Sequence, residues 1–161
     1  SLVSTALLAS SLLFAQNWTI EEVGTLPFKT ANNAVTLAYT NGQPHIYSFC
    51  GIDSTLNRSG IHLQAGAVNI QTGESIQYAD VPDTLGKIAA GASTVKNKIY
   101  LIGGYHVYAN GSELSSNKVH CFDPENETWE ADKQNIPVAI DDHVQAVWCR
   151  IVSRWEREII L

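Results

Sequence analysis

The sequence has few charged residues and no excess of basic ones. Charged residues make up 16% of the 161 residues, and the formal net charge is -6, whereas soluble domains usually have about a quarter of their residues charged. No basic patch is present, so the sequence lacks the electrostatic footprint needed to bind nucleic acid or an anionic membrane surface. We therefore expect neither of these as a partner.

Cysteine is scarce, and short motifs typical of metal or catalytic sites are missing. The three cysteines, Cys50, Cys121 and Cys149, do not form the Cys-x-x-Cys spacing of a zinc site. We expect Cys50 and Cys121 to be small buried apolar residues, with a disulfide between them as the alternative. No His-x-x-x-His pair, nucleophile motif or phosphate-binding glycine loop occurs. The sequence therefore predicts no metal, no cofactor and no catalytic residue.

The first part of the chain contains one uncharged apolar run, residues 2–14, followed by Ala15. This run is too short to span a bilayer comfortably and matches the hydrophobic region of a secretory signal with a small residue before the cleavage site. We predict a signal segment over residues 1–16 and a protein that is secreted, periplasmic or at the cell surface, without membrane insertion after the segment is removed. The alternative is that the run forms a buried strand or helix of the fold.

An internal repeat is the most informative property of the sequence. His45–Gly51 matches Lys98–Gly104 at an offset of 53, and Cys50 stands where Gly103 would be expected. A hydrophobic residue followed by proline recurs at an interval of 55, at Leu26-Pro27, Val81-Pro82 and Ile136-Pro137. Landmarks that recur at such similar intervals indicate tandem copies of one structural unit.

Each unit is predicted to contain four short strands, because runs of β-branched and aromatic residues alternate with turn residues. The predicted strands of the second unit are Ala89–Val95, Lys98–Ile102, Lys118–Phe122 and Thr128–Ala131. Those of the first unit are Asn33–Tyr39, His45–Phe49, Gly66–Ile70 and Ser75–Tyr78. Single flanking strands are predicted at Trp18–Glu22 and Val144–Trp148. Tight turns are expected at Asn41-Gly42 and Asn97-Lys98, where residues tolerant of positive φ are needed.

The second unit resembles a kelch repeat, the blade of a β-propeller. Its second strand ends in Gly103-Gly104, and a turn after its third strand leads to Trp129; the first unit has one such glycine and Ile76 in place of the tryptophan. The resemblance implies an all-β fold: a kelch-type β-propeller fragment, with two complete four-stranded antiparallel blades plus flanking strands, over residues 17–148. Structural roles are assigned to Gly51, Gly103, Gly104, Trp129, Pro27, Pro82 and Pro137.

The pattern does not continue through residues 149–161, which contain no glycine and no turn signal. We predict that this segment is an aberrant or truncated tail. Propellers close a ring of about four to eight blades, so the expected partners include the missing blades of the full-length chain. The two blades alone are predicted to be marginally stable or prone to aggregation, because their outer faces would lack neighbours.

The long loops are expected at one end of the blades, because consecutive antiparallel strands alternate in direction, and binding residues often lie on such loops. Aromatic rings with amides and carboxylates suit a sugar or a polar peptide. The candidate ligand-binding residues on this face are Tyr105, His106, Tyr108, Asn110, Asp53, Asn57, Arg58, His62, Asp141 and Asp142. Lys87 and His143 lie on the same connections. The alternative is that Tyr105, His106 and Tyr108 only pack their loop onto the sheet.

We therefore predict an exported binding module for a protein or a glycan, with no catalysis by the fragment. The alternative is a part of a sugar-active kelch propeller enzyme, similar to the sialic acid mutarotases or the galactose oxidases. Asp141, Asp142 and His143 contain the residue types of an acid/base or metal cluster. Adjacent strand residues point in alternate directions, however, so we do not expect both aspartates to face one ion. The kelch resemblance implies a structural role for His143 at the start of a first strand, and we expect His45 and His120 to be structural too.

Overall fold

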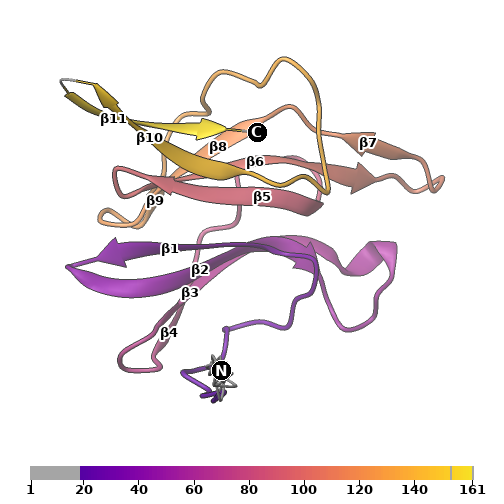
Figure 1. Cartoon of the computed structure of the whole chain (residues 1–161). Coiled ribbons are helices and arrows are strands. Elements are labelled where there is room, and N and C mark those ends of the chain that lie inside the picture. The colour runs from indigo at the N-terminus through magenta and orange to yellow at the C-terminus, as the bar shows by residue number, and fades with distance from the viewer. Residues whose placement is uncertain (1–18, 153, 161) are drawn as a thin grey trace, which may run out of the picture.

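The computed structural model describes the backbone of residues 19–152 and 154–160 and the side chains of residues 19–148. This part of the chain is built of antiparallel strands with one short 3₁₀ helix (Figure 1), so the predicted all-β fold is confirmed. It contains no helix with the length and apolarity needed to cross a membrane. The predicted signal segment, residues 1–16, lies outside the described residues.

The first four-stranded sheet is the first blade. Its strands lie in sequence order, and each pairs antiparallel with the next. They are β1 (Ala34–Thr40), β2 (Gln43–Ile52), β3 (Ile61–Asn69) and β4 (Ser75–Tyr78), with the 3₁₀ helix η1 (Arg58–Gly60) between β2 and β3. The β1–β2 turn is formed by Asn41 and Gly42, at φ 50° and 73°, as the sequence predicts for a tight hairpin.

The second blade repeats this order and adds one short strand. Its strand order is β5-β6-β8-β9, with β7 paired to β6. The bounds are β5 (Ile88–Val95), β6 (Lys98–Val107), β7 (Glu113–Ser115), β8 (Val119–Asp123) and β9 (Thr128–Trp129). The β5–β6 turn is formed by Lys96 and Asn97, both at positive φ, rather than by Asn97-Lys98. The predicted turn was one residue late because Lys98 already pairs with Val95.

The glycine pair confirms that the two blades are equivalent in backbone conformation. Gly103 and Gly104 have φ values of 65° and 81°, and Cys50 and Gly51 have values of 59° and 117°. Cys50 therefore adopts the left-handed conformation of the glycine it replaces, which is costly for a residue with a Cβ atom. In both blades the second residue of the pair donates a backbone hydrogen bond to the chain entering the next blade, from Gly51 to Lys87 and from Gly104 to Ile140.

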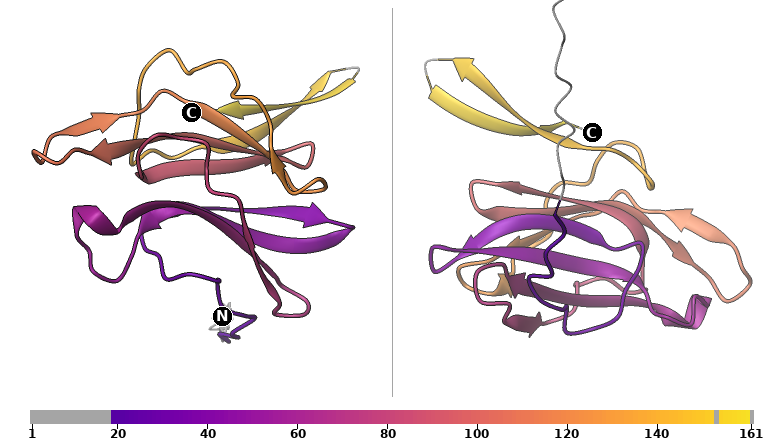
Figure 2. Two further views of the ribbon diagram at one scale, coloured as in Figure 1. Left: turned by 180° about the vertical axis from the view of Figure 1, so that it is seen from behind. Right: turned by 60° about the horizontal axis from the view of Figure 1, so that its bottom comes forward.

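The two sheets stack face to face, and aromatic side chains fill the space between them (Figures 1 and 2). Phe122 of the second blade lies 5.9 Å from Tyr47 and from Phe49 and 5.1 Å from Tyr78, measured between ring centroids. Trp129 packs on Phe122 at 5.1 Å and donates its indole N–H to the Ala79 carbonyl of the first blade at 2.9 Å. The tryptophan therefore anchors one blade on the other.

Three residues at the starts of successive first strands share a left-handed backbone. Asn32, Ala89 and Asp142 have φ values of 51°, 56° and 44°. The Ala89 N–H donates to the Asn32 carbonyl, and the Asp142 N–H donates to the Ala89 carbonyl, at 3.3 and 3.1 Å. A chain of backbone hydrogen bonds thus joins the start of each blade to that of the preceding one. The third member shows that the chain has begun another repeat.

That repeat starts with β10 (Ala146–Val152), which pairs antiparallel with β11 (Arg154–Ile160). The hairpin lies against β5 on the side of the second blade away from the first (Figure 2). The predicted strand Val144–Trp148 is therefore present but begins two residues later. The segment predicted as an aberrant or truncated tail nevertheless supplies β11, without a glycine pair.

Two sequence predictions about local structure were wrong. Thr19–Glu22, the described part of the predicted strand Trp18–Glu22, is not a strand, and Ile20 is fully exposed. A fourth strand needs a third strand beside it, and none precedes this segment in the described chain. The long loops that follow the predicted second strands were expected to cover residues 51–65 and 104–117. Both segments are partly strand, because β2 and β6 continue beyond their glycines and β7 folds back onto β6.

Cys50 and Cys121 are both buried and free. The prediction that they act as small apolar residues is therefore confirmed, and the alternative disulfide between them is excluded. Burial raises the pKa of the Cys50 thiol to about 12, and burial with the nearby Glu130 carboxylate raises that of Cys121 to about 11. Neither thiol is therefore an effective nucleophile near neutral pH.

Candidate functional site

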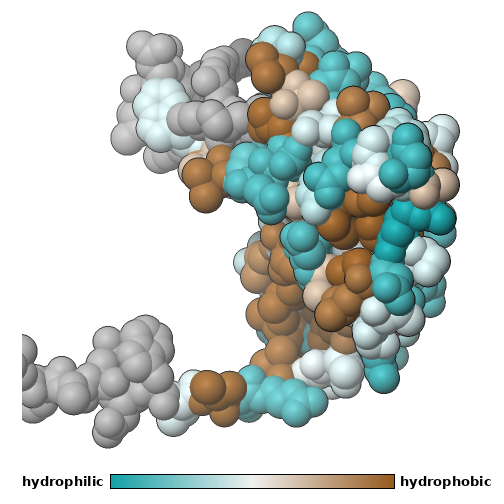
Figure 3. Space-filling model, turned by 90° about the vertical axis from the view of Figure 1, so that its right-hand side faces the viewer, coloured by the Kyte–Doolittle hydropathy of each residue, from teal (hydrophilic) through white to brown (hydrophobic). Residues whose placement is uncertain are grey.

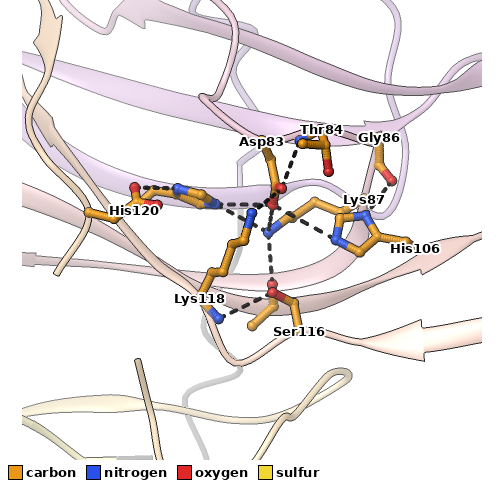
Figure 4. Close-up of polar contacts among 10 residues, drawn as sticks. Asp83, Thr84, Gly86, Lys87, His106, Ser116, Lys118 and His120 are labelled. Carbon is orange, nitrogen blue, oxygen red and sulfur yellow. Dashed lines mark hydrogen bonds and ion pairs between the residues drawn. The ribbon is translucent and has the colours of Figure 1, made fainter. Parts of the chain in front are cut away.

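A cluster of charged side chains lies buried where the linker between β4 and β5 crosses the second blade (Figure 4). Asp83 is at its centre. Its Oδ2 atom lies 2.7 Å from Lys87 Nζ and 3.2 Å from His120 Nε2, and its Oδ1 atom lies 2.6 Å from Lys118 Nζ. The side chains of Asp83, Lys87 and His120 are at most 1% exposed. The cluster therefore joins the linker to β8 through charges held away from water.

Asp83 uses its full capacity as an acceptor inside this cluster. Besides the three side-chain contacts, Oδ1 accepts a hydrogen bond from the Thr84 backbone N–H at 2.8 Å. An ionised carboxylate has about four acceptor sites, so Asp83 has none left for a ligand. Burial acts to raise the pKa of Asp83, but hydrogen bonds from His120, Lys118 and Lys87 outweigh it and hold this pKa well below the usual range. Asp83 is therefore a structural anion.

His120 fills the cluster on the β8 side. Its Nδ1 atom lies 2.8 Å from Asp132 Oδ1, so this nitrogen donates, and its ring packs edge-on against Trp129 with centroids 6.4 Å apart. Its Nε2 atom faces Asp83 and also lies 3.3 Å from Lys87 Nζ. These contacts place His120 in the junction between the blades, which fits the structural role predicted for it.

A pocket of about 230 Å³ opens above the cluster, between the linker and the β6–β7 hairpin. Asp83, His106 and Lys118 contribute to its polar side. Its apolar side chains are Leu85, Tyr108 and Leu114, which are 40%, 38% and 55% exposed. The pocket thus combines an apolar wall open to solvent with polar groups held in place by the buried charges.

The predicted residues of the β6–β7 region share one hairpin but differ in exposure. Tyr105 is half-buried on β6, and His106 is 8% exposed and contacts the Gly86 carbonyl through Nδ1 at 3.0 Å. Tyr108 is exposed at the pocket, whereas Asn110 lies at the hairpin tip, where its Oδ1 accepts hydrogen bonds from the Ser112 N–H and hydroxyl. His106 and Tyr108 therefore share a pocket, and Asn110 shapes a turn.

The predicted residues of the first blade lie on the β2–β3 loop, except His62 at the start of β3, and do not line this pocket. Asp53 Oδ1 accepts from the N–H and hydroxyl of Thr55, which hold the pKa of Asp53 below its usual value. Asn57 and Arg58 are exposed at η1. His62 packs edge-on against Phe28, and burial lowers its pKa. The loop extends on the same side as β7 (Figure 1), which agrees with the predicted long-loop end.

The residues that precede the third repeat do not form one cluster. Asp141 accepts a hydrogen bond from the Ser115 hydroxyl, whereas Asp142 is exposed and contributes its backbone N–H to the Ala89 carbonyl. His143 Nε2 contacts Gln145. Lys87, expected on the binding face, is instead fully buried against Asp83, because that carboxylate compensates its charge. Within the described residues, no group of three or more His, Cys, Asp or Glu side chains could hold a metal ion.

Sequence reasoning missed four residues of the pocket, which are Asp83, Leu85, Leu114 and Lys118. Comparison of the repeats could have identified Asp83. Asp83 follows the second hydrophobic-proline landmark, at the position occupied by Phe28 and Val138 after the other two. A carboxylate at a position that is apolar in the other copies predicts a specific buried partner, because an unpaired buried charge is costly. That partner, His120, pairs across the sheet with Leu101 on β6.

Acidification is expected to weaken the fold through Asp83. The pKa of Asp83 in the folded protein lies below its unfolded value of about 3.9. The contribution of Asp83 to stability is therefore complete above about pH 5 and is lost progressively as the pH falls below that value toward the pKa of the folded protein. Urea unfolding midpoints measured from pH 7 to pH 3 should therefore fall more for the wild-type protein than for Asp83→Asn. Midpoints that fall equally with pH in the two proteins would contradict this role of the Asp83 carboxylate.

Figure 3 looks onto the end that carries β7 and the β2–β3 loop. The molecule forms an arc, with hydrophobic residues along its hollowed side and hydrophilic residues along much of its outer rim. Val35, Leu37 and Tyr39 of β1 are 43–49% exposed, while the alternate residues Ala34 and Ala38 face the other blade. Stacked four-stranded antiparallel sheets, joined at their first strands and curving as an arc, are blades of a β-propeller.

Comparison with known proteins agrees with this class. The model of the Kelch motif matches residues 89–131, which cover β5 to β9. Residues 89–131 are thus identified as a Kelch motif. A solved structure titled "Structure of YjhT" is similar in fold, with a TM-score of 0.56 and 19% sequence identity over 79% of this chain and 34% of that one. The chain thus spans about a third of that structure's length. A comparison with curated proteins gave no match.

Proposed function

We propose that this chain is part of an exported kelch-repeat propeller that binds a protein or a glycan through its long-loop end. The observation that carries the proposal is the pocket between the β4–β5 linker and the β6–β7 hairpin, whose apolar wall of Leu85, Tyr108 and Leu114 is exposed. Exposed aromatic and aliphatic side chains beside fixed polar groups are typical of binding sites. The buried cluster beneath makes the site rigid, which lowers the entropic cost of binding.

Export is proposed from the apolar run at residues 2–14. In a host that secretes the protein, sequencing the N-terminus of the mature product should show removal of residues up to Ala15 or Gln16. A mature product that retains this run would contradict export through a cleaved signal.

Binding through the long-loop end is tested with the longest form of the protein that its gene encodes. Glycan arrays and defined candidate proteins are presented to the wild type, to Tyr108→Ala and to Lys96→Ala, which alters an exposed residue at the opposite, tight-turn end. We expect Tyr108→Ala to weaken binding by about ten-fold or more, as for an aromatic anchor, and Lys96→Ala to leave it unchanged. Binding that Tyr108→Ala does not affect would contradict the proposed face. Chemical conversion of a bound sugar would instead favour a sugar-active enzyme.

A further inference from the structure

We infer that the pocket beside His106 binds a single sugar ring through two neighbouring hydroxyl groups, one donating to His106 Nε2 and the other accepting from Lys118 Nζ. This inference rests on the proposed binding function and adds its location and ligand class. It starts from His106 Nε2, a ring nitrogen of a pocket residue that makes no hydrogen bond within the described residues and lies 3.8 Å from Asp83 Oδ2.

His106 is held in one orientation. Its Nδ1 atom lies 3.0 Å from the Gly86 carbonyl oxygen, and because a carbonyl only accepts, Nδ1 carries the hydrogen. In the neutral ring, Nε2 is then an acceptor. The nearest carboxylate oxygen, Asp83 Oδ2, is 3.8 Å away; it accepts from Lys87 and lies 3.2 Å from His120 Nε2. The His106 side chain is only 10% exposed and lines the pocket, so a ligand hydroxyl can supply the missing donor.

Lys118 supplies the complementary group. Its ammonium has three donors, of which one is used by Asp83 Oδ1 at 2.6 Å, and its side chain is 38% exposed. Both His106 Nε2 and Lys118 Nζ lie within 4 Å of the same carboxylate. The pocket lining therefore contains one acceptor near Asp83 Oδ2 and one donor near Asp83 Oδ1. Neighbouring hydroxyls of a pyranose match this pair, because each hydroxyl can donate or accept.

The shape and wall of the pocket favour a sugar over a longer peptide. Its volume of about 230 Å³ is below the roughly 300–1,000 Å³ of sites for drug-sized ligands, so it accommodates one ring. Tyr108 and Leu114 provide apolar surface on which the C–H face of a sugar can pack. The buried charges under the pocket keep Lys118 in place, and Asp83 is not available to compete for the hydroxyls.

The test uses the longest form of the protein that its gene encodes. A glycan array with neutral terminal pyranoses identifies the preferred sugar, and its methyl glycoside is then titrated by calorimetry into the wild type and variants. We expect His106→Phe and Lys118→Met each to weaken binding at least ten-fold. His106→Gln, which can donate to Gly86 and still accept from the ligand, should retain a larger part of the affinity. Lys96→Met, which removes an exposed charge at the opposite, tight-turn end, should change it less than two-fold.

Deoxy analogues of the same glycoside, titrated into the wild type, test the inference without any mutation. Loss of either of two adjacent hydroxyls should weaken binding at least ten-fold, and loss of the others should not. Sugar binding that is indifferent to both pocket variants would overturn the location while leaving the proposed function in place. A protein partner that competes for His106 and Lys118, with no sugar bound, would overturn the ligand class alone. A wild-type protein that binds neither would overturn both proposals.

Discussion

Asp83→Ala is expected to lower the free energy of unfolding by about 3–5 kcal/mol, as when one partner of a buried ion pair is removed. The substitution leaves the Lys87 ammonium fully buried, and it removes one acceptor each from Lys118 and His120. The measurement is urea unfolding at pH 7, followed by tryptophan fluorescence and circular dichroism. The loss should appear in both signals, because the cluster lies at the junction of the two blades.

The matched control removes both charges of the central pair. Asp83→Leu combined with Lys87→Met replaces them with apolar side chains and leaves no buried ammonium without a carboxylate, so it should recover at least half of the stability lost in Asp83→Ala. If Asp83→Ala lowered the free energy of unfolding by less than about 1 kcal/mol, the effect would be close to that of an ordinary surface substitution. Such a result would show that the buried cluster does not hold the blades together.

Phe122→Ala is the second change with a large expected effect, about 3–5 kcal/mol of lost stability. Phe122 is fully buried and touches the aromatic rings of both blades, including Tyr78 and Trp129 at 5.1 Å. The truncation opens a cavity in the middle of the interface. Urea unfolding should show an earlier midpoint, and Trp129 should become more accessible to the quencher acrylamide in the folded state.

Two controls separate this cavity from a general loss of apolar surface. Phe122→Leu keeps most of the buried volume and should cost less than half as much, whereas Val138→Ala, at a position that is 67% exposed, should change stability by no more than about 0.5 kcal/mol. Equal losses for Phe122→Ala and Phe122→Leu would mean that the ring contacts, rather than the volume, stabilise the junction.

The repeat made the fold predictable from the sequence. The offset between His45–Gly51 and Lys98–Gly104 identified equivalent strands, and the left-handed backbone of Cys50 confirms that it replaces a glycine. Strand ends were less predictable, because β6 continues past its glycine pair to Val107 and then pairs with β7. Hydrogen bonds within that hairpin, and not residue preference alone, decide where the strand stops.

The pocket was only partly predictable. His106 and Tyr108 were selected because they lie on a long connection after a buried strand, and both line the pocket. Asp83 and Lys118 were missed because they are more than 30 residues apart and meet only when the linker crosses the second blade. Lys87 was placed on the surface because lysine is rarely buried. Its carboxylate partner four residues earlier reverses that expectation.

The backbone hydrogen bonds that link Asn32, Ala89 and Asp142 also bear on how a gene could gain further repeats by duplication. Ala89 accepts from Asp142 the same backbone hydrogen bond that it donates to Asn32. If a gene segment encoding residues 89–141 were duplicated in frame, the new copy would therefore meet an acceptor carbonyl in the equivalent place. Recombination at these points changes the length of the protein by one whole module. The junction residues must keep a left-handed backbone, which asparagine, aspartate and glycine tolerate better than most.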